Sequence, residues 1–153
     1  MAVVQVVAFK VGKEEYGIEI SVVQEIVRYQ EITKIPDTPE FVEGIVNLRG
    51  TIIPIIDLKK RFKKEDVEES EQKVIIIVNL NNTLVGLTVD NVSEILRIQD
   101  KEIDPPPPII AGISRKYIKG IAKMDKRLII ILDIEQILSE GEKEQLASLV
   151  SNE

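Results

Sequence analysis

Runs of consecutive apolar residues predict that the chain is mainly β. Residues 74–78 and 128–132 are apolar at successive positions, which is typical of strands whose two faces are both covered. Residues 4–11 and 16–20 are also strand-like. Ile and Val make up 43 of the 153 residues, and β-branched side chains of this kind favour pleated sheets over helices.

A short helical turn is predicted after the first two strands, over residues 22–26. Apolar residues recur there at helical spacing, and Ser21 with Gln24 matches the spacing of a capping box. Asp90 precedes the matching segment in the second half of the chain and is expected to cap an equivalent turn. Both turns are expected to bury one face.

The chain contains an internal repeat. At an offset of 69 residues, segment 23–30 matches segment 92–99, with Val, Glu, Ile, Arg and Gln identical. After a seven-residue insertion the offset becomes 76, which sets Gly44 on Gly120. A period of this length is too long for a solenoid repeat. It therefore predicts two similar β subdomains of about five strands each, packed against one another.

We expect a single domain over residues 1–153. Its two subdomains are approximately 1–66 and 72–138, and strand exchange between them is allowed by the sequence. An acidic stretch between the two halves suits a solvated connection. Residues 139–153 have helical spacing and a cap signal at Ser139, so they predict a C-terminal helix that covers either the chain's own core or a partner.

A hairpin tip is predicted at Arg49 and Gly50, which stand between two apolar strands. Glycine supplies the positive φ that such a turn requires. The second half of the chain has Asp125 and Lys126 in this place. A residue that differs between two similar halves should not be required by their shared fold, so Arg49 is either a solvated charge or a functional one.

The composition removes most enzyme chemistry. With no His and no Cys, the chain lacks the commonest general base and the thiolates of disulfides and zinc sites. It also lacks the glycine-rich phosphate-binding motifs. Asp57 and Asp133 each follow a strand and are expected to cap a short helix rather than to act in catalysis. We therefore expect no enzyme activity, no metal and no cofactor.

Charge and hydropathy limit the partners. A net charge of −6 and a pI near 4.9 argue against nucleic acid. No apolar run approaches the roughly 18 residues of a membrane span, and the first residues lack the basic leader of a signal peptide. We expect a cytoplasmic protein with no direct membrane insertion, which acts through its surfaces.

Two proline-containing loops occupy equivalent places in the repeat. Pro36 and Pro39 in the first half match prolines of the run 104–108 in the second, and such stiff loops present the apolar residues that follow them. Those residues are Phe41 with Val42 and the pair 109–110. Each pair is either part of the core or an exposed contact patch.

These segments, taken in order, resemble the CheW family, the coupling proteins of bacterial chemotaxis. The resemblance covers nearly the full length and rests on residues 9–20, 23–26, 32–36, 39–44, 47–50, 53–58 and 128–134. It implies two SH3-like five-stranded β-barrels around a shared apolar core, with short helices and a C-terminal helix. This agrees with the subdomains expected from the repeat.

The resemblance also implies a mechanism. Members of the family are adaptors that bridge the cytoplasmic hairpin of methyl-accepting chemoreceptors to the regulatory domain of the histidine kinase CheA, in receptor arrays at the inner face of the membrane. The adaptor itself performs no chemistry. An apolar groove that receives an amphipathic helix, with a few charges to fix its register, is a common mode of recognition.

The resemblance assigns residues to two contacts. The receptor-binding residues would be Val23, Glu25, Ile26, Gly44, Asn47, Leu48, Arg49 and Gly50, and the repeat adds Val92, Ile95 and Leu96 as the opposite wall of the groove. The kinase-binding residues would be Phe41, Val42, Pro107, Pro108 and Ile109.

Two alternative functions remain beside the free-standing chemotaxis adaptor. The first is a CheW-like regulatory or scaffolding module of another two-component pathway; the chain length disfavours a kinase lobe or a fusion to a receiver domain. The second is a small-ligand-binding β protein that uses the cleft between the lobes. That function needs polar groups that converge on an apolar pocket, whereas the groove residues are mostly aliphatic.

Overall fold

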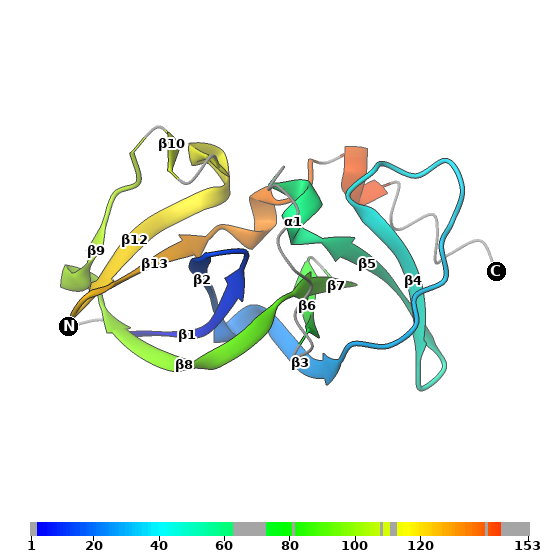
Figure 1. Ribbon diagram of the computed structural model, residues 1–153, viewed down its shortest axis with the longest axis horizontal. Helices are drawn as coiled ribbons and strands as arrows, with labels where there is room; N and C mark the ends of the chain where they lie inside the picture. Colours follow the sequence, from blue (N-terminus) through cyan, green and yellow to red (C-terminus); the bar gives the residue numbers. More distant parts are fainter. Residues whose placement is uncertain are drawn as a thin grey trace.

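The computed structural model describes residues 3–62, 73–80, 82–107, 109–110, 113–139 and 141–144. The described chain forms two lobes that lie side by side, and each lobe is built on one curled sheet (Figure 1). One sheet has six strands and the other has five. The predicted class, mainly β with two barrel-like subdomains and few short helices, is confirmed.

The six-stranded sheet, called sheet A, runs in the order β8 (Asn91–Gln99), β1 (Val3–Val11), β2 (Glu14–Glu19), β13 (Arg127–Leu132), β12 (Ile118–Met124) and β9 (Ile103–Asp104). Sheet B runs in the order β3 (Val23–Arg28), β6 (Val74–Leu80), β7 (Thr83–Val89), β5 (Thr51–Asp57) and β4 (Val42–Leu48). Two further strands, β10 (Ile109–Ile110) and β11 (Ile113–Ser114), pair with each other alone. The helical elements are α1 (Leu58–Arg61) and the 3-10 turns η1 (Ile20–Val22), η2 (Asp100–Glu102), η3 (Arg115–Tyr117) and η4 (Ile134–Gln136).

The two sheets cut across the two halves of the sequence. Sheet A takes β1 and β2 from the first half and the remaining strands from the second half, while sheet B takes β6 and β7 from the second half. The ranges 1–66 and 72–138 therefore describe the sequence repeat and not the two lobes. The strand exchange that the sequence left open is the observed pairing, with β1 antiparallel to β8 over Val3–Lys10.

The strand orders of the two sheets are equivalent. Strands β8, β1, β2, β13 and β12 of sheet A correspond in order to β3, β6, β7, β5 and β4 of sheet B. Each sheet contains one parallel pair at the same place, where Ile131 lies opposite Gly17 and Ile55 lies opposite Gly86. The repeat seen in the sequence is thus a repeat of sheet positions.

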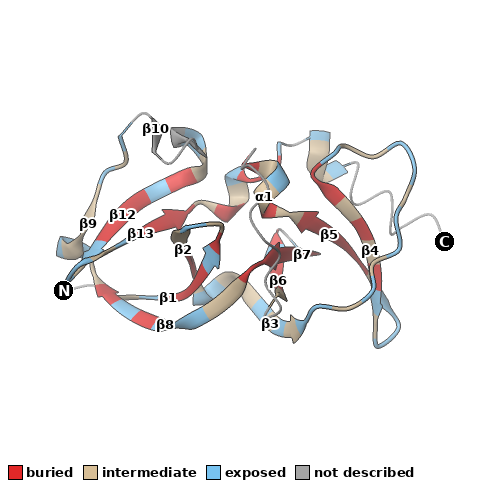
Figure 2. Cartoon of the chain, viewed as in Figure 1, coloured by how far each residue is buried: buried red, intermediate tan, exposed pale blue. Residues whose placement is uncertain are grey.

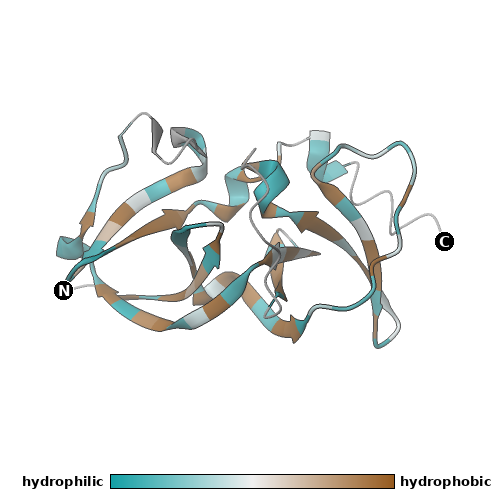
Figure 3. Ribbon diagram, viewed as in Figure 1, coloured by the Kyte–Doolittle hydropathy of each residue, from teal (hydrophilic) through white to brown (hydrophobic). Residues whose placement is uncertain are grey.

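The described residues form three apolar clusters, and Figures 2 and 3 show the buried and hydrophobic stretches along the strands. One cluster lies within sheet A and includes Ala8, Ile98 and Ile129, and a second lies within sheet B and includes Ile53 and Ile75. A third and larger cluster draws on strands of both sheets. Residues 75–78 of β6 and 129–132 of β13 are buried on both faces, so the prediction from the apolar runs is confirmed there. Leu128, the first residue of the second run, is instead 60% exposed.

The predicted helical turn over residues 22–26 is wrong. Only residues 20–22 form a 3-10 turn, and the chain then continues as β3, which alternates half-buried and exposed residues. Its equivalent, β8, is also a strand. The apolar residues here are Val and Ile, whose branched side chains favour extended backbone and outweigh the helical spacing. Asp90 does not cap a helix: its carboxylate accepts the Gly12 N–H at 2.7 Å and pairs with Lys59 at 2.9 Å.

The other predicted caps are found in part. Asp57 caps α1 and accepts the Lys59 N–H at 2.9 Å, as predicted. Asp133 occupies the cap position of η4 but makes no side-chain cap bond. Ser139 and Glu142 form a reciprocal capping box, with bonds of 3.1 and 2.8 Å. A helical turn follows at residues 141–144, and the rest of the predicted C-terminal helix lies outside the described residues. Within the described ranges, no helix is long and apolar enough to cross a lipid bilayer.

Candidate functional site

The predicted hairpin tip at Arg49 is confirmed. Arg49 and Gly50 both have positive φ, at 52° and 90°, which closes the two-residue turn between β4 and β5. The Asn47 side-chain oxygen accepts the Gly50 N–H at 2.8 Å. This bond fixes the turn, so the exposed Asn47 shapes the tip on which the arginine is carried.

Arg49 forms an ion pair with Glu25 of β3. Strands β3 and β4 are the two edges of sheet B, so this pair joins the edges across the barrel opening by side chains. A second link of the same kind is the hydrogen bond from the Tyr29 hydroxyl to Glu43 at 3.0 Å. The Arg49 side chain remains 69% exposed, so its guanidinium can still meet a partner.

The other lobe contains an equivalent ion pair. Arg127, at the start of β13, bonds Glu94 of β8 at 3.0 Å and Glu15 of β2 at 2.5 and 3.1 Å. Glu94 is the repeat counterpart of Glu25. The hydrogen bonds that Arg127 donates to Glu15, together with the charges and hydrogen bonds of both glutamates, raise the pKa of Arg127 although burial acts in the opposite sense. In both lobes an arginine thus pairs with the glutamate of an edge strand, but Arg127 lies on β13 within sheet A and not on the opposite edge.

This finding corrects the argument from the repeat. In the repeat, Asp125 and Lys126 stand in the place of Arg49 and Gly50, which predicted that the shared fold does not require the arginine. The second lobe supplies its arginine two residues farther along, at the base of the hairpin instead of the tip. The two pairs differ in exposure, because Arg127 has two carboxylate partners and is 39% exposed. Arg49 therefore contributes to barrel closure and is also the more accessible of the two.

An exposed isoleucine accompanies each ion pair. Ile26 follows Glu25 and is 41% exposed, and Ile95 follows Glu94 and is 56% exposed. Strands β3 and β8, which carry them, run along the same side of the molecule, the lower side in Figure 1. We call Ile26, Ile95 and the two ion pairs the isoleucine face. Exposed aliphatic residues beside fixed charges are typical of surfaces that bind an amphipathic helix.

Several residues that the resemblance assigned to the receptor groove have other places. Val23 and Val92 are half-buried and pack against the shared cluster. Leu96 is buried within the sheet A cluster, and Leu48 packs against the sheet B cluster. These four side chains pack in or against the apolar clusters, so they add little exposed surface to the isoleucine face.

Gly44 is buried and has a structural role. A Cβ atom at this position would lie 2.0 Å from the Thr33 carbonyl oxygen. The close approach allows Thr33 and Ile45 to form a two-bond bridge that ties the loop after β3 to β4. Gly120 is its counterpart, with a Cβ position 2.9 Å from the Asp104 carbonyl oxygen. The glycine is thus explained by backbone packing in both lobes.

The predicted kinase-binding residues are placed in part. Phe41 and Val42 are only 8% and 7% exposed, so they belong to the core and their side chains do not form a contact patch. The Arg61 guanidinium covers the Phe41 ring at 4.3 Å. Pro107 is exposed, while Pro108 and the side chain of Ile109 lie outside the described residues. The kinase contact stays a prediction.

A family model, the CheW-like domain, matches residues 5–142. The chain belongs to this family. It is 41% identical over 134 residues to the chemotaxis protein CheW of Klebsiella aerogenes, with 88% of this chain and 81% of that protein covered. It is 38% identical over 149 residues to CheW of Treponema pallidum, with 95% and 88% covered. These similarities confirm the resemblance seen in the sequence.

A solved structure supports the same assignment. The crystal structure of the scaffolding protein TtCheW from Thermoanaerobacter tengcongensis matches with a TM-score of 0.84 and 44% sequence identity, and the match covers 91% of this chain and 90% of that one. At this identity both the fold and the family are shared. Among the described residues of the present chain, no group of three or more His, Cys, Asp or Glu side chains could hold a metal ion.

Proposed function

We propose that this chain is a non-enzymatic adaptor that couples the cytoplasmic hairpin of methyl-accepting chemoreceptors to the regulatory domain of the histidine kinase CheA. Membership of the CheW-like family supports the chemotaxis role. The observation that carries the receptor contact is the isoleucine face. It combines two exposed aliphatic side chains with arginines that are held in place by glutamates.

The receptor contact follows from helix recognition. An amphipathic helix laid on the isoleucine face would bury Ile26 and Ile95 and place an acidic side chain near Arg49. Because these side chains are 41% and 56% exposed, burying the remaining surface of one is worth about 0.6–1.7 kcal/mol. Among the described residues Arg49 has a single carboxylate partner, Glu25, so an acidic group of the receptor can share it at small cost.

The kinase contact is assigned to another region of the chain, around residues 107–109. Pro107 is exposed at the end of a proline run that follows β9, and stiff extended segments of this type bind partners with little loss of entropy. Phe41 and Val42 are buried, so they would affect the kinase contact only by filling the core. We infer that the adaptor works in the cytoplasm, recruited to receptor arrays by these two contacts.

The test is a calorimetric titration against a receptor cytoplasmic fragment and, separately, against the CheA regulatory domain. Ile26→Asp should weaken receptor binding by about tenfold or more and leave CheA binding unchanged. Arg49→Glu should act in the same direction. The matched control is Val3→Asp, because Val3 is also an exposed aliphatic residue on a strand but is next to neither ion pair in sequence or in strand register.

Two results would contradict the proposal. If Ile26→Asp and Val3→Asp change receptor affinity equally, the isoleucine face is not the receptor contact. If the wild-type chain binds neither partner while its circular dichroism shows a folded β protein, the adaptor role is wrong and only the fold is shared with the family.

A further inference from the structure

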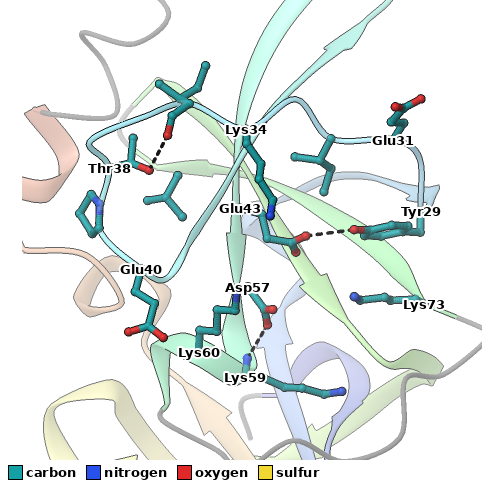
Figure 4. A pocket seen from close by; sticks show the side chains of 14 residues that line it. Tyr29, Glu31, Lys34, Thr38, Glu40, Glu43, Asp57, Lys59, Lys60 and Lys73 are labelled. Atoms are coloured by element: carbon teal, nitrogen blue, oxygen red, sulfur yellow. Dashed lines mark hydrogen bonds between the residues drawn. The ribbon is translucent and has the colours of Figure 1, made fainter.

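A cavity of about 640 Å³ lies in the lobe built on sheet B, called lobe B here, while the lobe built on sheet A is lobe A. It is bounded by sheet B, α1 and the loop of residues 29–41 that arches between β3 and β4 (Figure 4). The loop is fixed by the Thr33–Ile45 bridge and by a hydrogen bond from the Thr38 hydroxyl to the Ile35 carbonyl at 3.1 Å. The volume of the cavity falls within the range of small-molecule binding sites.

Two carboxylates lie together in the wall of the cavity. Glu43 accepts a hydrogen bond from Tyr29 through one oxygen, while its other oxygen, Oε1, is buried and has no hydrogen-bond partner. Asp57 lies beside it (Figure 4), and burial, followed by the charge of Glu43, raises the pKa of Asp57. A buried carboxylate oxygen without a donor is costly, so this pair favours an incoming ammonium group.

Lysine side chains supply the opposite charge. Lys34 extends from the loop toward Glu43, and Lys60 extends from α1 near Asp57 (Figure 4). Both lysines are exposed. Their ammonium groups can hold an anionic group at the opening of the cavity. Lys59 and Lys73 also line the cavity, and the charge of Lys73 partly offsets the raised pKa of Asp57. The cavity thus offers both acidic and basic groups.

The other lobe serves as an internal comparison. Residues Lys119, Asp133 and Glu135 are the repeat counterparts of Glu43, Asp57 and Lys59, and they line a cavity of only about 30 Å³. Lys119 pairs there with Glu19 at 3.3 Å. Lobe A therefore carries its own ammonium group where lobe B carries a second carboxylate. The shared fold does not require the acidic pair.

We propose that the cavity binds a small zwitterion, with its ammonium group at Glu43 and Asp57 and its carboxylate at Lys34 and Lys60. The ligand ammonium would take the place that the Lys119 side chain has in lobe A. Its carboxylate would lie between the two lysines, which are exposed at the opening of the cavity and reach toward Glu43 and Asp57. An amino acid is the simplest molecule with this pair of charges. The site is independent of the proposed adaptor function.

The test is a nuclear magnetic resonance titration of the full chain with 4-aminobutyrate, with butyrate and butylamine as one-charge probes. We expect saturable amide shifts in residues 31–43 and 57–60, with a Kd of about 1 mM or lower. Both one-charge probes should bind at least about tenfold more weakly, because each loses one of the two ion contacts.

Variants assign the site to its residues. Glu43→Lys introduces the residue of the other lobe and should abolish binding. Glu43→Gln keeps the size of the side chain and should weaken binding about tenfold, which covers the case in which the lysine variant does not fold. Lys119→Gln is the matched control in lobe A and should bind as the wild type does. The proposal is overturned if 4-aminobutyrate gives no saturable shifts up to about 10 mM, if Glu43→Gln binds unchanged, or if either one-charge probe binds as tightly as the zwitterion.

Discussion

Replacing Gly44 with Ala is expected to destabilise the fold rather than to remove a receptor contact. The new Cβ atom would lie 2.0 Å from the Thr33 carbonyl oxygen and 2.9 Å from the Ile32 side chain. The first distance is more than an ångström shorter than a normal carbon–oxygen contact of about 3.3 Å. The loop would have to move away, and the bridge between Thr33 and Ile45 would break.

The cost can be worked out from the contacts. The bridge consists of two backbone hydrogen bonds of 2.9 Å, each worth about 1 kcal/mol net. Gly44 has a φ of 149°, and a side chain in such a conformation adds about 1–2 kcal/mol of strain. The total is about 3–4 kcal/mol. For a domain of this size that corresponds to a fall in Tm of about 10 °C.

The assay is thermal unfolding followed by circular dichroism, with Gly50→Ala as the control. Gly50 also has positive φ, at 90°, but a Cβ there meets nothing within 4 Å. This control should lose only about 1 kcal/mol, the conformational part alone. If Gly44→Ala unfolds within about 0.5 kcal/mol of the wild type and yet loses receptor binding, Gly44 is a recognition residue and the packing argument is refuted.

Three further substitutions test the core and the titrating groups. Ile76 is fully buried, so Ile76→Asp buries an unpaired charge and should lower the free energy of unfolding by more than about 4 kcal/mol. A urea titration should then find little folded protein. A stable variant would show that the shared core is open to water. Burial and the nearby Glu43 raise the pKa of Asp57, so its ionisation opposes folding and stability falls as pH rises through the acid range. Asp57→Asn keeps the helix cap and should raise Tm at pH 7 but not at pH 3, and equal gains at both pH values would rule out the charge as the cause. The Ser139 N–H and Arg61 hold the pKa of Glu142 below its usual range, although burial acts in the opposite sense. Glu142→Gln should therefore lower Tm at pH 7 by an amount that disappears as pH falls through that pKa. A loss of Tm that persists at pH 3 would point to packing instead.

The sequence predicted the elements better than their pairing. The unbroken apolar runs of β6 and β13 predicted buried strands correctly, because burial on both faces leaves a direct mark on composition. The repeat predicted two similar units, but similarity does not tell which copy of a strand pairs with which. The exchange of β1 and β2 into the sheet of the second half could therefore be left open but not decided.

Two predictions near the candidate site were wrong or incomplete, the helical turn at residues 22–26 and the place of the second arginine. Helical spacing at residues 22–26 competed with β-branched side chains, and the pairing of β3 with β6 decided the outcome in favour of a strand. The second arginine was missed because Arg127 lies two positions from the site predicted by the repeat. Glu94, the exact repeat of Glu25, was the signal that could have prompted a search for its partner.

The exchange of strands between the halves also governs how the protein can be made. Sheet A cannot close until β13 has left the ribosome, because β2 pairs with β13 in parallel through Tyr16 and Gly17. The first 60 residues must therefore wait as an incomplete sheet with exposed edges, a state that chaperones recognise and that favours aggregation. Each sheet of the finished protein takes strands from both halves of the chain, so neither half can complete a lobe alone. A tension applied between partners on the two lobes would be carried by the backbone ladders of both sheets at once.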